Sequence, residues 1–336
     1  MKEGALIRLE HGSGGALSRD LVESVIHPFF RSESYPELSD ASPVEAGSDF
    51  LMTTDGYVVD PPFFPGGDIG GLSVWGTCND LAVCGAKPIC VSLALVLEEG
   101  FAVADLKKVL QSAAAAAREA DTRIVTGDTK VVPRGRGGGI FVTTAGLGRR
   151  VFSGVLSPSR IREGDSVIIS APLGAHGLTV LAARESLPVA GTLRSDMAFL
   201  YPPVSLLFPL EESLRFLRDA TRGGIAAVLN EAAHGAAWGI RIAEAEIPVS
   251  EEVRTVADLL GLNPLEIANE GVFVAVVDAQ AETAALQALR GHPLGRTARC
   301  VGHVSLENPG TVLMTTRIGG TRRVDFPRGL LLPRIC

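Results

Sequence analysis

Four glycine-rich loops punctuate this chain of 336 residues, and each directly precedes a segment of helical character. They cover residues 12–15, 66–71, 174–177 and 223–224. Glycine leaves the backbone N–H groups at the start of a helix unobstructed, which suits them to bind phosphate. None of the loops matches G-x-x-x-x-G-K-[ST], and none is a G-x-G-x-x-G after a strand. The ordinary P-loop and the dinucleotide fingerprint are therefore excluded.

A polar, turn-rich stretch near residues 150–165 divides the chain. Strands and helices are mixed in both halves without strict strand–helix alternation, which predicts two α+β domains rather than one doubly wound parallel sheet. We expect an N-terminal domain over residues 1–155 and a C-terminal domain over residues 156–325. The remaining residues, 326–336, contain two prolines and no hydrophobic period, so they are expected to form a flexible tail.

Within the first domain, residues 89–97 predict a buried strand and residues 105–121 an alanine-rich helix. Shorter strands are expected at 123–126 and 140–146. The sequence between them, GDTKVVPRGRGGG, is expected to be a loop that carries Asp128, Thr129 and Lys130.

Composition narrows the class of function. The net charge of −7 disfavours a nucleic-acid binder with a basic footprint. No secretory signal begins the sequence, and its most apolar stretch, residues 89–97, is too short to span a membrane. Five cysteines in such a chain favour a reducing cytoplasm, where Cys84, Cys90 and Cys300 are expected as small packing residues.

Isolated acidic residues stand in glycine-rich, small-residue or apolar surroundings. They are Asp40, Asp55, Asp80, Asp128 and Asp219. Any one of them alone is better explained as a turn or a helix cap, and Asp219 before ATRGG fits an N-cap. Together with the phosphate-binding loops, however, they favour metal and nucleotide binding, because Mg²⁺ takes hard oxygen ligands.

Three further residues are candidates for proton transfer. Lys130 is either a phosphate contact or proton acceptor, or a solvated lysine. Glu270, in IANEGV, is either a catalytic acid or a surface acid. His176, in PLGAHGL, is either a phosphate contact or proton shuttle, or a structural histidine. Residue type and spacing leave these alternatives open.

One long block, TTDGYVVDPPFFPGGDIGGLSVWGTCNDLAVCGAKP, stands between HGSGG and GDTKVV, and the chain ends in PRIC. In these segments the sequence resembles the HypE family, the carbamoyl dehydratases of nickel–iron hydrogenase maturation. This family belongs to the aminoimidazole-ribonucleotide-synthetase-like ATP-binding superfamily. Residues 53–88 carry the likeness to the superfamily, and residues 333–336 carry the likeness to the HypE family.

The resemblance implies a homodimer of two-domain α/β chains. The mixed sheets of the N-terminal domains would pair into a β-barrel, the C-terminal domain would be an α/β sandwich, and ATP would bind between the domains. It implies that Mg²⁺ is held by Asp40, Asp55, Asp80 and Asp219. Nucleotide contacts would come from Gly12, Ser13, Gly14, Gly15, Asp55, Asn79, Asp80, Asp128 and Thr129.

The implied reaction is the ATP-dependent dehydration of an S-carboxamide on the chain's own Cys336 to a thiocyanate, the donor of cyanide for the hydrogenase. Cys336, Lys130, Glu270 and His176 would form the catalytic set. The carbamoyltransferase HypF would load the cysteine, and a HypC–HypD complex would accept the cyanide. The non-functional alternative for residues 326–336 is a frayed terminus. This alternative does not explain the exposed thiol of Cys336.

Two other functions remain as alternatives. One is another enzyme of the superfamily, such as a selenophosphate synthetase, a thiamine-phosphate kinase or a purine-pathway cyclo-ligase. The loop HGSGGALS contains no cysteine, which counts against the selenophosphate enzyme. The other is a nucleotide-binding scaffold without catalysis.

Overall fold

Two β-sheets, one in each half of the chain, organise the computed structural model, which describes residues 7–12, 14–29, 39–45, 49–187 and 193–327. The first sheet has the strand order β1-β2-β7-β5-β6. Its strands are β1 (Ser42–Pro43), β2 (Phe50–Tyr57), β5 (Ala86–Glu98), β6 (Arg123–Val132) and β7 (Ile140–Arg150). β5 and β6 are parallel and the other neighbours antiparallel, so the sheet is mixed, as predicted.

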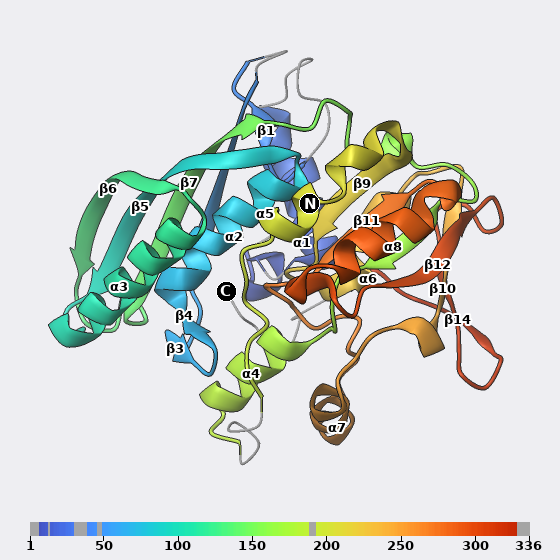
Figure 1. The fold of residues 1–336 in the computed structure, drawn as a ribbon. Helices are drawn as coiled ribbons and strands as arrows, with labels where there is room; N and C mark the ends of the chain where they lie inside the picture. The colour runs from blue at the N-terminus through green and yellow to red at the C-terminus, as the bar shows by residue number, and fades with distance from the viewer. Residues whose placement is uncertain (1–6, 13, 30–38, 46–48, 188–192, 328–336) are drawn as a thin grey trace.

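Helices α2 (Ile69–Val83) and α3 (Val103–Glu119) lie along the same face of this sheet (Figure 1). The burial of side chains alternates along β2, as expected for a sheet that is covered on one face only. Leu51 and Tyr57 are buried on the face that the helices cover, while Met52 points to the other face and is 51% exposed. The two helices approach closely at Gly70, where a Cβ atom would lie 2.1 Å from the carbonyl oxygen of Val109. Only glycine fits this contact.

Strand β6 differs from the sequence-based expectation. It continues to Val132 instead of ending at residue 126, so Asp128, Thr129 and Lys130 lie in a strand and not in a loop. Parallel pairing with β5, from Cys90 to Glu98, supplies the long-range hydrogen bonds that local sequence does not reveal. The β-branched residues at 129, 131 and 132 suit the extended backbone.

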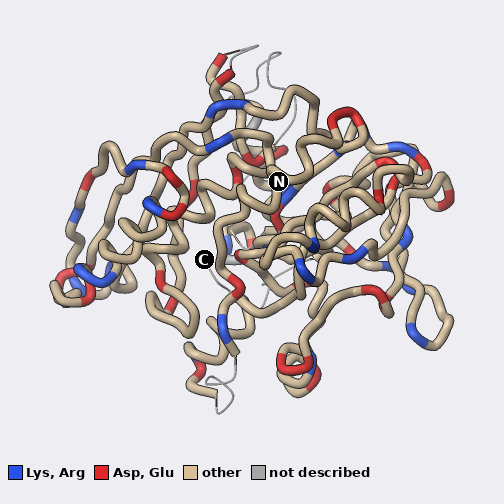
Figure 2. Tube along the Cα trace, viewed as in Figure 1, with Lys and Arg blue, Asp and Glu red and all other residues tan. Residues whose placement is uncertain are grey.

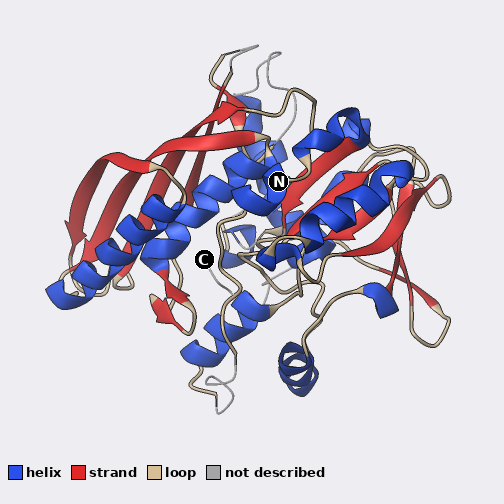
Figure 3. Ribbon diagram, viewed as in Figure 1, coloured by secondary structure: helices blue, strands red, loops and turns tan. Residues whose placement is uncertain are grey.

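The second sheet has seven strands in the order β14-β13-β10-β12-β8-β11-β9. They are β8 (Ser166–Ile169), β9 (Leu214–Asp219), β10 (Gly239–Ala243), β11 (Phe273–Val277), β12 (Arg299–Ser305), β13 (Val312–Thr315) and β14 (Thr321–Arg323). Residues of α6 (Gly224–Ala233) pack on one face, and residues of α5 (Tyr201–Ser205) and α8 (Glu282–Arg290) on the other. The C-terminal half is therefore a layered α/β structure (Figure 3).

Shorter elements complete the fold. They are α1 (Gly15–Leu21), the π-helical turn Val22–Ile26, the hairpin of β3 (Phe63–Phe64) and β4 (Gly67–Asp68), α4 (Ala175–Arg184), α7 (Glu251–Leu260), and 3-10 turns at Leu9–Gly12, His27–Phe29, Pro158–Arg160, Phe208–Ser213, Glu244–Glu246, Ala279–Ala281 and Pro293–Gly295. Among the described residues, no helix is both long and apolar enough to cross a membrane. Lys and Arg are interspersed with Asp and Glu over both halves (Figure 2).

The two halves share a core at the end of α2. Ala82 and Val83 pack in one cluster with Leu217 of β9 and Phe273 of β11. Nearby, the Asn79 amide donates to the carbonyl oxygen of Ala198 (2.9 Å) and accepts from the amide of Leu200 (2.8 Å). This packing brings the carboxyl end of β9 against the first sheet.

Candidate active site

Four acidic residues from distant parts of the sequence meet where the two halves join. Asp55 lies on β2, Asp80 on α2 and Asp219 at the last position of β9, while Asp40 precedes β1. The Thr53 hydroxyl links two of them, because its Oγ1 lies 2.7 Å from the carbonyl oxygen of Asp40 and 2.9 Å from Asp80 Oδ2. The structure thus places the four predicted metal ligands in one region, close enough to repel one another, although no three of their carboxylates have oxygens within 4.8 Å of one another. Their role as ligands remains a prediction.

The cluster holds excess negative charge. Burial, followed by repulsion from Asp219, Asp40 and Asp55, raises the pKa of Asp80 well above its ordinary value. Burial and Asp40 likewise raise the pKa of Asp219 to about 8. Carboxyl groups so destabilised in their ionised form gain most from a bound cation. Their oxygen donors fit Mg²⁺.

Arg218 compensates one side of the cluster. Its guanidinium donates from Nε and Nη2 to the carboxylate of Asp40 at 2.7–3.0 Å, and from Nη1 to Glu231 Oε2 at 2.8 Å. The three side chains are only 19–29% exposed, so both charges of each pair are largely removed from water. Asp40 is therefore fixed by the C-terminal half although it belongs to the N-terminal half.

Glu270 joins the cluster electrostatically. It is 8% exposed, and burial together with repulsion from Asp219, Asp196 and Asp55 raises its pKa well above the ordinary value. Asp196 positions its backbone, since Asp196 Oδ2 accepts from the amides of Glu270 (3.2 Å) and Gly271 (3.0 Å). A raised pKa in a buried site is typical of residues that move protons.

A cavity of about 720 Å³ opens beside the cluster. Its walls include Gly14, Gly15, Asp40, Arg218, Asp219, Thr221, Arg222 and Glu231. The first glycine-rich loop therefore faces the acidic cluster across this cavity. Ser13 of the same loop lies outside the described residues, as does Cys336.

The chain returns to this loop at its other end. The carbonyl oxygen of Pro327 accepts a hydrogen bond from the amide of Ala16, 3.0 Å away. Gly15 makes the contact possible, because at its φ of +72° a Cβ atom would lie 2.4 Å from that oxygen. The last described residue is thus anchored at the edge of the cavity.

Two predicted residues are engaged in packing. The side-chain amide of Asn79 is hydrogen-bonded to the backbone of Ala198 and Leu200, as described above. His176 is fully buried; its Nδ1 lies 2.7 Å from Ser195 Oγ, its ring meets Phe64 edge-on, and burial lowers its pKa to about 3. His176 is the second residue of α4, and Asp196 accepts from its amide at 2.8 Å, which connects the start of this helix to the backbone at Glu270.

Lys130, Asp128 and Thr129 lie away from the cluster in the single chain. Sheet register pairs Asp55 with Thr144, Thr144 with Leu93, and Leu93 with Gly127, so β6 is three strand spacings, about 14 Å, from β2.

The side chains of Asp128 and Lys130 also point to the opposite face from Asp55. Gly127 shares the helix-covered face with Leu93, so its successor Asp128 faces away, and Lys130 Nζ lies 2.6 Å from Asp128 Oδ2. We call this uncovered side, which also carries Phe50 and Met52, the open face of the first sheet.

Sequence analysis missed Arg218, Glu231 and Asp196. Arg218 directly precedes Asp219, and Asp196 is a lone acid in SDMAF, the same kind of context that singled out the other acids. Asp40 lies 178 residues from Arg218, and Glu270 lies 74 residues from Asp196, so only the fold reveals these contacts.

Comparisons with known proteins agree with this architecture. Residues 38–150 match the family described as "AIR synthase related protein, N-terminal domain", and residues 162–314 match "AIR synthase related protein, C-terminal domain". The fold and the acidic site at the junction therefore define a two-domain protein of the AIR synthase-related class.

Within this class the chain belongs to the HypE family of carbamoyl dehydratases. It is 45% identical to "Carbamoyl dehydratase HypE" of Cupriavidus necator over 98% of this chain and 95% of that one. It is also similar to a structure described as the HypE–HypF complex (40% identity, TM-score 0.86, 91% and 99% coverage). A structure of HypE in complex with ATP matches with 40% identity, a TM-score of 0.82 and coverage of 98% and 99%.

Proposed function

We propose that this protein dehydrates an S-carboxamide carried on its own Cys336 to a thiocyanate, with ATP as the co-substrate. The observation that carries the proposal is the anchoring of Pro327 against Ala16, at the rim of the acidic cavity. Nine residues follow Pro327 up to Cys336. An extended chain of that length spans about 30 Å, which suffices to bring a thiol on this segment into the cavity.

The acidic cluster suits Mg²⁺ and nucleotide phosphates. Asp40, Asp55, Asp80 and Asp219 would hold the cation, which supplies charge neutralisation for the phosphates when it is bound. The backbone amides of the loop at residues 12–15, at the start of α1, would contact the phosphates. Support comes from the raised pKa values of Asp80 and Asp219, which follow from burial and from repulsion among the carboxyl groups.

The chemistry requires a better leaving group than the carbamoyl oxygen. In the first step that oxygen attacks the γ-phosphorus of ATP, ADP leaves, and the nitrogen loses one proton. In the second step a base takes the remaining N–H proton, the C–O bond breaks, phosphate departs and the C≡N bond forms. Glu270 is the base we favour, because it is buried beside the acidic cluster and its raised pKa strengthens it as a base.

A homodimer would complete the surface that the single chain leaves uncovered. The open face carries the exposed apolar side chains of Phe50 and Met52, and β6 is exposed along nearly its whole length. Pairing of two open faces would form the proposed barrel and enclose Asp128 and Lys130 between subunits, where Lys130 would act on the nucleotide or the reacting group. Apolar side chains exposed side by side on one face of a sheet are a common feature of protein interfaces.

The proposed partners follow from the family. A carbamoyltransferase of the HypF type would load Cys336, in keeping with the solved HypE–HypF complex. A HypC–HypD complex would accept the cyanide group. We place the reaction in the cytoplasm, where a free reactive thiol is kept reduced.

The test is intact-protein mass spectrometry of the full chain with a HypF-type transferase, carbamoyl phosphate and ATP. We expect a carbamoyl adduct on Cys336 that loses one water only when ATP is present. Cys336→Ala should abolish the adduct, and Cys90→Ser is its matched control. Glu270→Gln should accept the adduct and stall before the loss of water.

Two outcomes would contradict the proposal: no adduct on Cys336, or an adduct that ATP leaves unchanged. An adduct-free chain that still binds ATP would favour the nucleotide-binding scaffold instead. The relatives at 45% identity are carbamoyl dehydratases, so the other enzymes of the superfamily are not favoured.

A further inference from the structure

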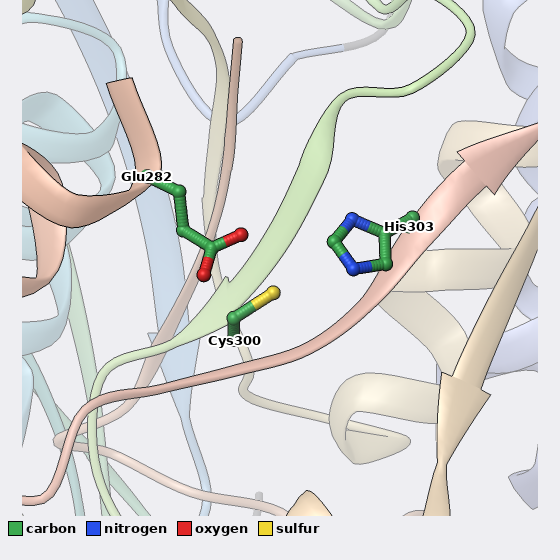
Figure 4. Close-up of side chains that lie close together, drawn as sticks. All are labelled: Glu282, Cys300 and His303. Atoms are coloured by element: carbon green, nitrogen blue, oxygen red, sulfur yellow. The ribbon is translucent and has the colours of Figure 1, made fainter. Parts of the chain in front are cut away.

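A second group of potential metal ligands lies in the C-terminal half, outside the proposed active site. Glu282, Cys300 and His303 each offer one donor atom, and these atoms lie within 4.8 Å of one another. Their side chains converge from two elements, the first turn of α8 and strand β12 (Figure 4). Among the described residues, this is the one such trio with its donor atoms so close together.

An irregularity in β12 creates the convergence. Cys300 and His303 are three residues apart, so a regular strand would direct them to opposite faces of the sheet. The register of β12 against β8 shifts between Cys300 and Gly302, and the two side chains therefore pair with Ile168 and Ser166, which are two residues apart on one face. A bulge of this kind re-aims a side chain, and such bulges are enriched at functional sites.

The surroundings orient the donors. The hydroxyl of Ser166 donates to Glu282 Oε2 at 2.6 Å and lies 3.4 Å from His303 Nδ1. Because the hydroxyl proton is directed to Glu282, the serine oxygen can only accept from the ring, which favours the tautomer with a proton on Nδ1. That tautomer leaves the lone pair of His303 Nε2 available. A polar neighbour that fixes ligand orientation in this way is a regular feature of metal sites.

We propose that Glu282, Cys300 and His303 form a binding site for a divalent transition metal of the Zn²⁺ type, separate from the Mg²⁺ site. A carboxylate, a thiolate and an imidazole are the three ligand types that Zn²⁺ combines, at bond lengths of about 2.0–2.3 Å. In a tetrahedral site these bonds place the donor atoms about 3.3–3.8 Å apart. Small side-chain rotations therefore close the trio around the ion, and His303, which is exposed, has the freedom to make them.

The position of the trio suggests what the metal would do. Glu282 is the first residue of α8, and the strand that carries the other two ligands lies beneath this helix. A bound ion would tie the helix to the sheet and leave its fourth coordination position open to water or to an external ligand. The inference does not depend on the proposed dehydratase reaction.

The experiment is a titration of the full chain with Co²⁺ in the presence of excess Mg²⁺, which occupies the acidic cluster. A Cys336→Ala background removes the C-terminal thiol, which could itself bind soft metals. We expect one Co²⁺ per chain, a thiolate-to-cobalt charge-transfer absorption, and loss of that absorption when one equivalent of Zn²⁺ is added. Cys300→Ser should remove the absorption, and His303→Ala should weaken binding at least about tenfold.

Cys90→Ser in the same background is the matched control and should leave the spectrum unchanged. His303 is exposed and Cys300→Ser is nearly isosteric, so circular dichroism is expected to show folded variants. The proposal is overturned if the parent shows no thiolate absorption at saturating Co²⁺, or if the absorption survives Cys300→Ser. It is also overturned if His303→Ala binds Co²⁺ as tightly as the parent.

Discussion

The carbonyl oxygen of Pro327 and the amide of Ala16 form a 3.0 Å hydrogen bond that joins the two ends of the described chain. The bond sits beside Gly14 and Gly15, which line the cavity next to the acidic cluster. The described chain therefore ends next to the first glycine-rich loop, at the edge of this cavity.

Replacing Gly15 tests this connection. In Gly15→Ala the new methyl group would meet Pro327 O at 2.4 Å, and the left-handed φ of +72° adds about 1 kcal/mol of strain. We expect carbamoylation of Cys336 to proceed normally and the ATP-dependent loss of water to slow by about tenfold or more, as measured by mass spectrometry. Gly164→Ala is the control, because Gly164 has a similar φ of +85° and nothing lies within 4 Å of its Cβ position. Equal rates in both variants would contradict the role of this contact.

The acidic cluster predicts a pH-dependent stability. The folded-state pKa of Asp219, raised to about 8 by burial and by Asp40, lies far above the ordinary value of 3.8. The folded protein therefore binds this proton more tightly than the unfolded chain, and stability falls as the pH rises from about 4 to about 8.

In Asp219→Asn this loss is absent. Without Mg²⁺, we expect the variant to be more stable than the parent at pH 8, on the order of 2–4 kcal/mol, and to lose this advantage near pH 4. Urea unfolding at both pH values measures the difference. Added Mg²⁺ should stabilise the parent more than the variant, and an unchanged pH profile would show that Asp219 is not the group concerned.

Arg218 should be essential for stability. Arg218→Ala leaves Asp40 and Glu231 buried without their partner, which costs about 3–5 kcal/mol. Arg299→Ala removes an ion pair with Glu246 that is half exposed on both sides, and is expected to cost less than about 1 kcal/mol. Chemical denaturation compares the two variants. A small effect at Arg218 would mean that solvent reaches these carboxylates.

The exposed apolar side chains of the open face predict a dimer, and we expect a single charge introduced into this face to disrupt it. Met52 is 51% exposed in the single chain, and Met52→Glu would bury a carboxylate in the proposed apolar interface. Sedimentation should find the parent at twice the chain mass and the variant at the chain mass. Ile318→Glu, in an exposed turn between β13 and β14, should remain dimeric. A parent that sediments as a monomer would refute the pairing.

Much of the acidic site was predictable from sequence, because its members share a local signature. Asp55, Asp80 and Asp219 each stand as lone acids among small or apolar residues, and the structure buries Asp219 and partly buries the other two. Asp219 nevertheless ends a strand and does not cap a helix, since Gly223 precedes α6.

That strand, β9, was not predicted, and its charged residues explain why. Arg215 is buried within it at 5% exposure and is neutralised by Asp278, 63 residues away. From its local sequence alone, such a segment is interpreted as polar and not as a buried strand. Lys130 illustrates the same limit, because the face to which it points follows from pairing with β5 and not from its neighbours in the sequence.

The amide of Asn79 has a mechanical consequence. It fastens α2, which carries Asp80, to the backbone at Ala198 and Leu200, and Ala198 in turn donates to the carbonyl oxygen of Glu270. These hydrogen bonds therefore hold Asp80, which would bind the cation, and Glu270, which would accept the proton, in fixed positions relative to each other. A hinge opening between the halves would break these hydrogen bonds, so we expect reactants to enter and leave without separation of the two domains.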